Sequence, residues 1–168
     1  MTNDSDTILA TLRQIIRAID LHSKSLTKRY GLTGPQLLVL KELNRNGDLT
    51  IGQVAQNVNL SQATVTTILD RLEKLQFVQR VRNAVDKRKV NILLSEKAKD
   101  ILRGDPSLLQ EEFIERFEQL EDWEKTLLIS SLQRIASMMK AEGIVSPPVL
   151  VSGPLAATER EVGDFLDD

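Results

Sequence analysis

The sequence predicts a mainly α-helical fold with a small β wing, in which a winged helix-turn-helix is joined to N- and C-terminal dimerisation helices. Three observations predict it. Apolar residues recur at helical spacing through most of the chain. Helix-capping signatures begin at Thr33, Thr50 and Ser61, so that short helices follow one another closely. Two β-prone runs are then separated by a charged hairpin tip.

Length and composition restrict the possible classes. The 168 residues suffice for one domain, and 41% hydrophobic with 27% charged residues is an ordinary globular balance. The chain has no cysteine and a single histidine, His22, which argues against disulfides, zinc fingers and metal sites built on several histidines. Without a signal-peptide pattern or a membrane-length apolar run, we expect a cytoplasmic protein with no membrane partner. We also expect no cofactor.

The first two helices are expected over about residues 7–29 and 34–46. The first has an amphipathic pattern and is expected to stop at Gly31. Thr33 and Gln36 form a capping box for the second, and Asn46-Gly47 ends it.

The next two helices have helix-turn-helix spacing. Thr50 and Gln53 form a second capping box, which opens a short helix. A tight turn over residues 57–60 follows, and Ser61 caps a helix that runs to about Lys74. We expect strands over residues 77–82 and 90–94, with a polar tip between them that forms the wing.

The C-terminal part is expected to be helical again. Ser95 caps a helix that residues 104–106 interrupt, with Asp105 as a new N-cap. Asp122 is expected to cap a last helix, closed by Gly143. The predicted domain therefore covers residues 1–143, with a DNA-binding lobe at about 33–95, and residues 144–168 form an acidic tail that contains Pro and Gly.

Charge is unevenly distributed despite a net charge of −2. Residues 61–94 hold seven basic and three acidic side chains, whereas residues 95–143 hold seven basic and eleven acidic ones. A basic segment between acidic ones suits a protein that presents one positive face to nucleic acid.

The helix after Ser61 has the residue types that a recognition helix needs. A helix that enters the major groove needs small polar residues on its exposed face, because bulky side chains would hold its backbone away from the bases. Glutamine can pair with an adenine edge, alanine or threonine methyls can touch thymine methyls, and arginine suits phosphate. The candidate residues of this helix are Ser61, Gln62, Ala63, Thr64, Thr66, Thr67 and Arg71. A solvated polar face remains the plain alternative.

The wing favours the DNA-binding interpretation. Lys87, Arg88 and Lys89 lie at its tip, and Arg80 and Arg82 lie on the strand before it. Together they would form a basic arm beside the recognition helix. A wing used for protein contact would be expected to be neutral or acidic.

Residues 49–95 resemble the MarR family of transcription regulators. The matching residues are Leu60-Ser61-Gln62-Ala63-Thr64-Val65-Thr66, Leu69-Asp70-Arg71-Leu72-Glu73, Val78 with Arg80, Asp86-Lys87-Arg88 and Leu93-Leu94-Ser95. With the flanking helices, the resemblance covers about residues 7–142. It implies a dimer held by the first and last helices, with wings that reach the minor groove through Asp86 and Arg88. The family's usual arginine before that aspartate is replaced by Val85.

Two narrower expectations concern the signal. Residues 15–24 and 30–36 resemble the MarR branch that regulates compatible-solute genes, such as those for ectoine synthesis. The resemblance also implies a small-molecule effector cleft beside the DNA-binding lobe, which His22 and Tyr30 could line. Alternatively, these two residues form a hydrogen-bonded core or interface pair.

The function predicted from the sequence is that of a sequence-specific DNA-binding transcription regulator. We expect a homodimer that represses by occupying a pseudo-palindromic operator in double-stranded DNA and responds to a small-molecule or osmotic signal. The alternatives are a winged-helix protein-protein interaction module and a non-specific architectural DNA binder. No catalytic arrangement is recognisable, so an enzyme is not expected.

Overall fold

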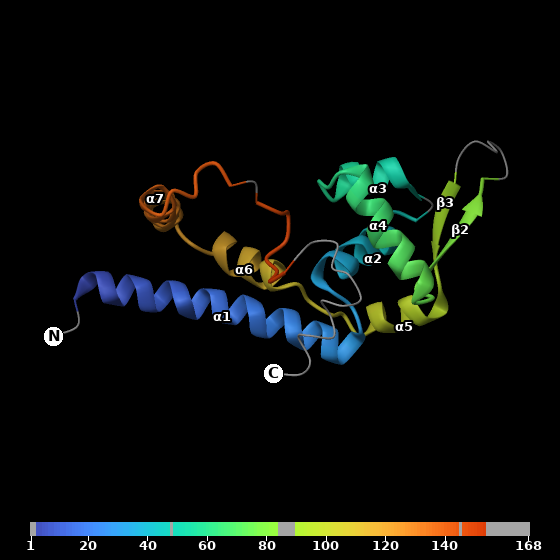
Figure 1. The fold of residues 1–168 in the computed structure, drawn as a ribbon, viewed down its shortest axis with the longest axis horizontal. Coiled ribbons are helices and arrows are strands. Elements are labelled where there is room, and N and C mark those ends of the chain that lie inside the picture. The colour runs from blue at the N-terminus through green and yellow to red at the C-terminus, as the bar shows by residue number, and fades with distance from the viewer. Residues whose placement is uncertain (1–2, 48, 84–89, 145, 154–168) are drawn as a thin grey trace.

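The computed structural model describes residues 3–47, 49–83, 90–144 and 146–153 (Figure 1). The elements follow in the order α1 (Asp4–Tyr30), α2 (Gly34–Asn46), β1 (Leu49–Thr50), α3 (Ile51–Asn57), α4 (Gln62–Lys74), β2 (Val78–Arg82), β3 (Val90–Leu94), α5 (Glu96–Arg103), α6 (Leu109–Glu118) and α7 (Asp122–Met138). The predicted mainly α-helical fold with a small β wing is confirmed.

Helix boundaries in the first half follow the capping residues. Gly31 ends α1 in the left-handed conformation, with φ of 67°, which a glycine adopts without a Cβ penalty. The Thr33 N–H donates to the Gln36 amide oxygen at 2.9 Å, and the Thr50 N–H donates to that of Gln53 at the same distance. Both predicted capping boxes therefore begin their helices where the sequence placed them.

The sheet has three antiparallel strands in the order β1-β3-β2. The pairing of β2 with β3 is the predicted wing hairpin, and it sets Arg80 opposite Ile92. The sequence analysis missed β1, which pairs Leu49 with Ile92 and Thr50 with Asn91. Two residues are too few to show an alternating pattern, so only the partner strand reveals this one.

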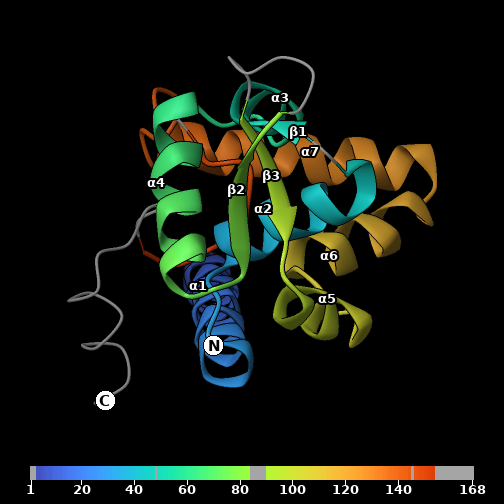
Figure 2. The ribbon, with the colours of Figure 1, turned by 90° about the vertical axis from the view of Figure 1, so that its right-hand side faces the viewer.

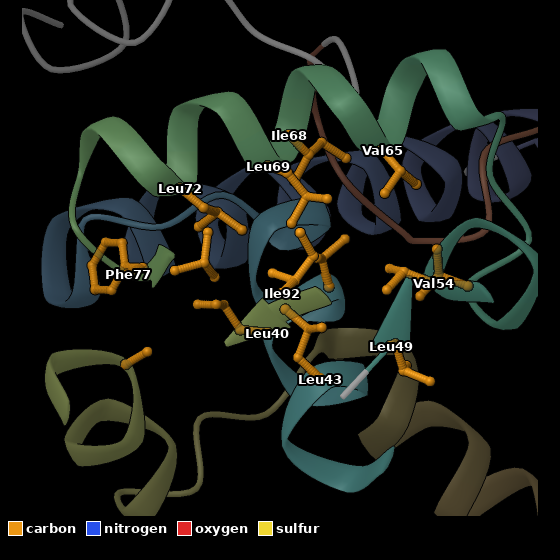
Figure 3. Packing of buried hydrophobic residues seen from close by; sticks show 14 of the residues in the cluster. Leu40, Leu43, Leu49, Val54, Val65, Ile68, Leu69, Leu72, Phe77 and Ile92 are labelled. Carbon is orange, nitrogen blue, oxygen red and sulfur yellow. The ribbon is translucent and has the colours of Figure 1, made fainter. Parts of the chain in front are cut away.

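The main core lies between α2, α3, α4 and the sheet (Figure 3). Leu40 of α2, Leu69 of α4 and Ile92 of β3 are at most 1% exposed, and they meet at its centre. Burying a leucine or isoleucine side chain stabilises a fold by about 1.5–3 kcal/mol. This core fixes α4 against α2, α3 and the sheet.

Two expected helix starts in the C-terminal half are wrong. Asp105 does not cap α6, because it adopts a left-handed backbone with φ of 46°. The buried Leu108 follows, and its N–H donates to the Glu111 carboxylate at 2.9 Å before the helix begins. The last helix is likewise capped by Glu121 rather than Asp122, and it ends at Met138, before Gly143.

Helices α6 and α7, and the segment 146–153, lie outside this main core. In Figure 1, α6 and α7 lie apart from the sheet and α4, and in the turned view of Figure 2 α7 lies behind them. Neither helix buries a residue in the single chain. Residues 146–153 return from α7 to the junction of α1 and α2, where Val149 is buried beside Leu26 and Leu37. Within the described ranges, no helix is long and apolar enough to cross a membrane.

Candidate nucleic-acid interface

The polar face of α4 is accessible, whereas its apolar face is fixed in the core. Val65, Ile68, Leu69 and Leu72 are at most 1% exposed. Ser61, Gln62 and Ala63 are exposed at the start of the helix, and the half-buried candidates are Thr64, Thr66, Thr67 and Arg71. The structure thus places all seven predicted recognition-helix residues on one element.

Hydroxyl groups at the start of α4 are already ordered. Ser61 Oγ accepts the Thr64 N–H at 3.1 Å and lies 2.8 Å from Thr64 Oγ1. Thr66 Oγ1 donates to the Gln62 carbonyl at 2.7 Å, and Thr67 Oγ1 donates to the Ala63 carbonyl at 3.0 Å. The hydroxyl protons of both threonines are thereby occupied, so these side chains can offer a lone pair or a methyl group to DNA.

The Gln62 side chain extends back over the start of α3. A Cβ built on Gly52 would lie 2.9 Å from Gln62 Nε2. The absence of a side chain at position 52 therefore leaves room for the Gln62 amide group in this position.

Gly52→Ala should consequently change sequence preference without much change in stability. The new methyl group meets only the flexible end of Gln62, so the amide shifts while the core stays intact. We expect a Tm close to that of the wild type, together with an altered base preference in a selection from random duplexes. The double variant Gly52→Ala/Gln62→Ala should behave like Gln62→Ala alone, and a large loss of Tm in Gly52→Ala would contradict this account.

Arg80 is not part of a free basic arm. Its guanidinium donates to Asp70 at 2.5 Å and to Glu73 at 2.7 Å, and its backbone N–H donates to Glu73 at 3.2 Å. Both carboxylates belong to α4, and the Arg80 side chain is only 26% exposed. Arg80 therefore ties β2 to α4. The sequence analysis placed Arg80 in a basic arm beside this helix, and the structure places it beside the helix but with its charge paired to two carboxylates.

Other basic groups of this face remain available. Arg71 and Arg82 have no ion-pair partner within the described part of the chain, and Arg82 is exposed on β2. The predicted contacts Asp86, Lys87 and Arg88 lie outside the described residues.

Glu42 is a supporting residue that the sequence analysis missed. It is only 9% exposed, and its carboxylate accepts the amide groups of Asn46 at 2.5 Å and Asn57 at 2.6 Å. The bond to Asn57 links α2 to the end of α3 and so positions the turn before α4. Spacing on one helix could have suggested the bond to Asn46, but Asn57 belongs to another element and gives no periodic signal.

The two effector candidates are separated along α1. His22 is half-buried, and its Nε2 atom is buried with no hydrogen-bond partner among the residues that the structure describes. Tyr30 packs against both hydrophobic clusters, with the Arg29 guanidinium carbon 5.2 Å from its ring centroid. Eight helical residues correspond to about 12 Å of rise, so the two side chains lie at different levels. Among the described residues, no group of three or more His, Asp or Glu side chains could hold a metal ion.

Comparison with known proteins agrees with this geometry. The MarR family model matches residues 32–90. The uncharacterized HTH-type transcriptional regulator YsmB of Bacillus subtilis is 31% identical over 130 residues, which cover 77% of this chain and 89% of that protein. The chain belongs to the MarR family.

Two further proteins are similar to this chain, one in sequence and one in fold. The HTH-type transcriptional repressor MdtR of B. subtilis is 26% identical over 106 residues, covering 61% of this chain and 68% of that protein. The crystal structure of the S. aureus MepR-DNA complex matches with a TM-score of 0.55 and 22% identity, covering 77% of this chain and 96% of that one. This MarR protein is a DNA-binding transcription regulator and not an enzyme.

Proposed function

We propose that this protein is a homodimeric repressor that reads a pseudo-palindromic operator with α4. The observation that carries the proposal is the two-sided character of α4. Its apolar side is fully buried in the core, and small, ordered polar side chains lie on its accessible side near the start of the helix. The N–H groups of Gln62 and Ala63 lie in the first turn, outside the helical hydrogen-bond ladder, and suit a phosphate.

The proposed contacts divide into two kinds. Gln62, Ala63 and the three threonines would read base edges, because they are small or amide-bearing groups on the accessible face. Ser61 would hold the first turn in place through Thr64, and Arg71 would meet phosphate. For the wing, the proposal rests on sequence alone. Lys87 would contact the DNA backbone, Arg88 would enter the minor groove, and Asp86 would orient Arg88 or Arg71.

The homodimer is supported by apolar surface that the single chain leaves uncovered. Exposed fractions are 47% for Ile15 of α1, 52% for Phe113 of α6, and 58% and 52% for Leu127 and Leu132 of α7. Large apolar side chains exposed together on these helices point to an interface. In a two-fold dimer, the apolar surface of each copy covers the same surface of the other copy. The symmetry then places two α4 helices to read two half-sites.

Repression and an effector belong to the same proposal. One relative carries the name of a repressor, and operator occupancy is the simplest route to repression. His22 supports an effector site, because a buried ring nitrogen without a partner is a group that a ligand could satisfy. The narrower link to compatible-solute genes gains no support from the relatives.

Selection of DNA from a random pool tests the function and separates it from both alternatives. We expect one preferred palindromic sequence, to which Gln62→Ala and Thr64→Ala bind more weakly by about 1–3 kcal/mol, with relaxed preference at the contacted bases. Gln79→Ala is the matched control, because Gln79 is also an exposed glutamine but lies on β2.

The outcomes distinguish three classes of protein. A protein-protein interaction module would retain no DNA from the pool. An architectural binder would retain DNA without a preferred sequence. Unchanged preference in Gln62→Ala and Thr64→Ala would show that another surface reads the operator.

A further inference from the structure

Residues 146–153 lie against a surface formed by α1, the start of α2 and the region from Leu108 into α6, which is here called the groove. The chain segment that contacts the groove, residues 149–152, is here called the strap. It contacts three elements that are distant in sequence, namely α1, the start of α2, and the region from Leu108 into α6. Sequence patterns alone indicate only an irregular tail here, because the short apolar run of this stretch has no periodicity.

Polar contacts hold the other two residues of the strap, Leu150 and Ser152. The Leu150 N–H donates to the side-chain oxygen of Gln110 in α6 at 3.1 Å. The Ser152 N–H donates to Ser23 Oγ at 3.2 Å, and Ser152 Oγ donates to the Asp20 carboxylate at 3.3 Å. Backbone N–H groups of this irregular segment are thus satisfied by side chains of two different helices.

Apolar contacts fix the two valines of the strap, Val149 and Val151. Val149 is 3% exposed and forms a cluster with Leu26, Leu37 and Leu108, which are also nearly fully buried. Val151 approaches the first residue of α2 so closely that a Cβ on Gly34 would lie 2.5 Å from its Cγ1 atom. Position 34 therefore has to be glycine while Val151 is in place.

We propose that the strap is an intramolecular ligand of this groove, and that its binding fixes α1 relative to the DNA-binding lobe and so raises operator affinity. α1 carries part of the proposed dimer surface, whereas α2 supports α4. A contact that joins α1 to the start of α2 limits the motion of one recognition helix relative to the other. Two helices already held at a fixed spacing lose less freedom on binding two half-sites. This inference rests on the proposed function, because it requires a dimer that reads DNA.

Gly34→Ala is the variant that expels the strap with the least other change. Alanine is well tolerated in a helix, and the new methyl group meets Leu108 only at an ordinary 3.9 Å. In Gly34→Ala/Val151→Ala the clash is removed, because the Val151 Cβ also lies 3.9 Å away. Val149→Asp releases the strap from its own side and leaves α1 and α2 unaltered.

Two measurements on the full-length variants test the proposal. Hydrogen exchange of residues 146–153 reports occupancy of the groove, and titration of the selected operator reports affinity. We expect Gly34→Ala and Val149→Asp to accelerate exchange and to weaken operator binding about fivefold to tenfold, through lost pre-organisation. The double variant should restore slow exchange and most of the affinity.

Other results would overturn the proposal in identifiable ways. Exchange in the wild type as fast as in an unstructured peptide would show that the strap does not occupy the groove. Accelerated exchange with unchanged or tighter operator binding would show that occupancy is not coupled to affinity in this direction. Failure of the wild type to select any DNA sequence would refute the proposed function and the coupling together, while the exchange data would still decide occupancy.

Discussion

Leu132→Asp is expected to separate the protein into monomers and to abolish tight operator binding. Leu132 lies in the middle of α7 and is 52% exposed in the single chain, so aspartate there leaves the fold of the monomer unstrained. In a dimer the same carboxylate would be buried without a partner, which is strongly unfavourable. A monomer holds one half-site only, and the lost avidity lowers operator affinity by about 10²–10⁴-fold.

Sedimentation and operator titration check this result together. The variant should sediment as a species of 18.9 kDa and the wild type as twice that mass. Gln133→Asp is the control, because it adds the same charge on the polar side of α7, in line with Thr126 and Ser130. A wild-type protein that sediments as a monomer at micromolar concentration would refute the proposed dimer.

The order of the elements could be predicted because local signals specify it. The two capping boxes at Thr33 and Thr50, and the Ser61 cap, involve residues three positions apart, so their chemistry is visible in the sequence. Helical periodicity likewise identifies the buried face of α4. The failures at Asp105 and at the start of α7 are boundary errors, where a capping-type residue stood near the correct position without being the cap.

The parts that escaped prediction depend on contacts between distant segments. The strand β1 exists because β3 pairs with it, and the strap exists because Ser23 and Gln110 accept its N–H groups. No periodic pattern marks either. For the site, residue types predict a recognition helix but do not show which way a long side chain turns. The sequence analysis therefore grouped Arg80 and Arg82 in one basic arm, whereas Arg80 pairs with Asp70 and Glu73 and Arg82 has no ion-pair partner among the described residues.

The different roles of Arg80 and Arg82 lead to an expected difference between otherwise matched variants. Each variant removes one positive charge from the same strand. Arg82 is exposed with no ion-pair partner among the described residues. Arg82→Ala should therefore lower the affinity for all DNA sequences alike, through the loss of about one phosphate contact. Arg80→Ala frees the carboxylates of Asp70 and Glu73 beside the DNA and detaches the wing strand from α4.

Arg80→Ala should therefore weaken operator binding about tenfold to hundredfold, or about 1.4–2.8 kcal/mol. The free energy of unfolding should fall by only about 1 kcal/mol, because both ion pairs are partly exposed and screened by solvent. A loss of function with little loss of stability is the expected result of misplacing the wing.

Arg80→Lys decides between this positioning role and a direct contact of Arg80 with phosphate. Lysine keeps the charge and would serve a phosphate, but one ammonium group cannot reproduce the planar fork that reaches Asp70 and Glu73 at once. We expect Arg80→Lys to lose most of the affinity that Arg80→Ala loses, as measured by fluorescence anisotropy on one operator at fixed salt. If Arg80→Lys binds like the wild type, the charge alone matters and Arg80 acts directly on DNA. Because the guanidinium is already shared between two carboxylates of the recognition helix, the structure favours the first result.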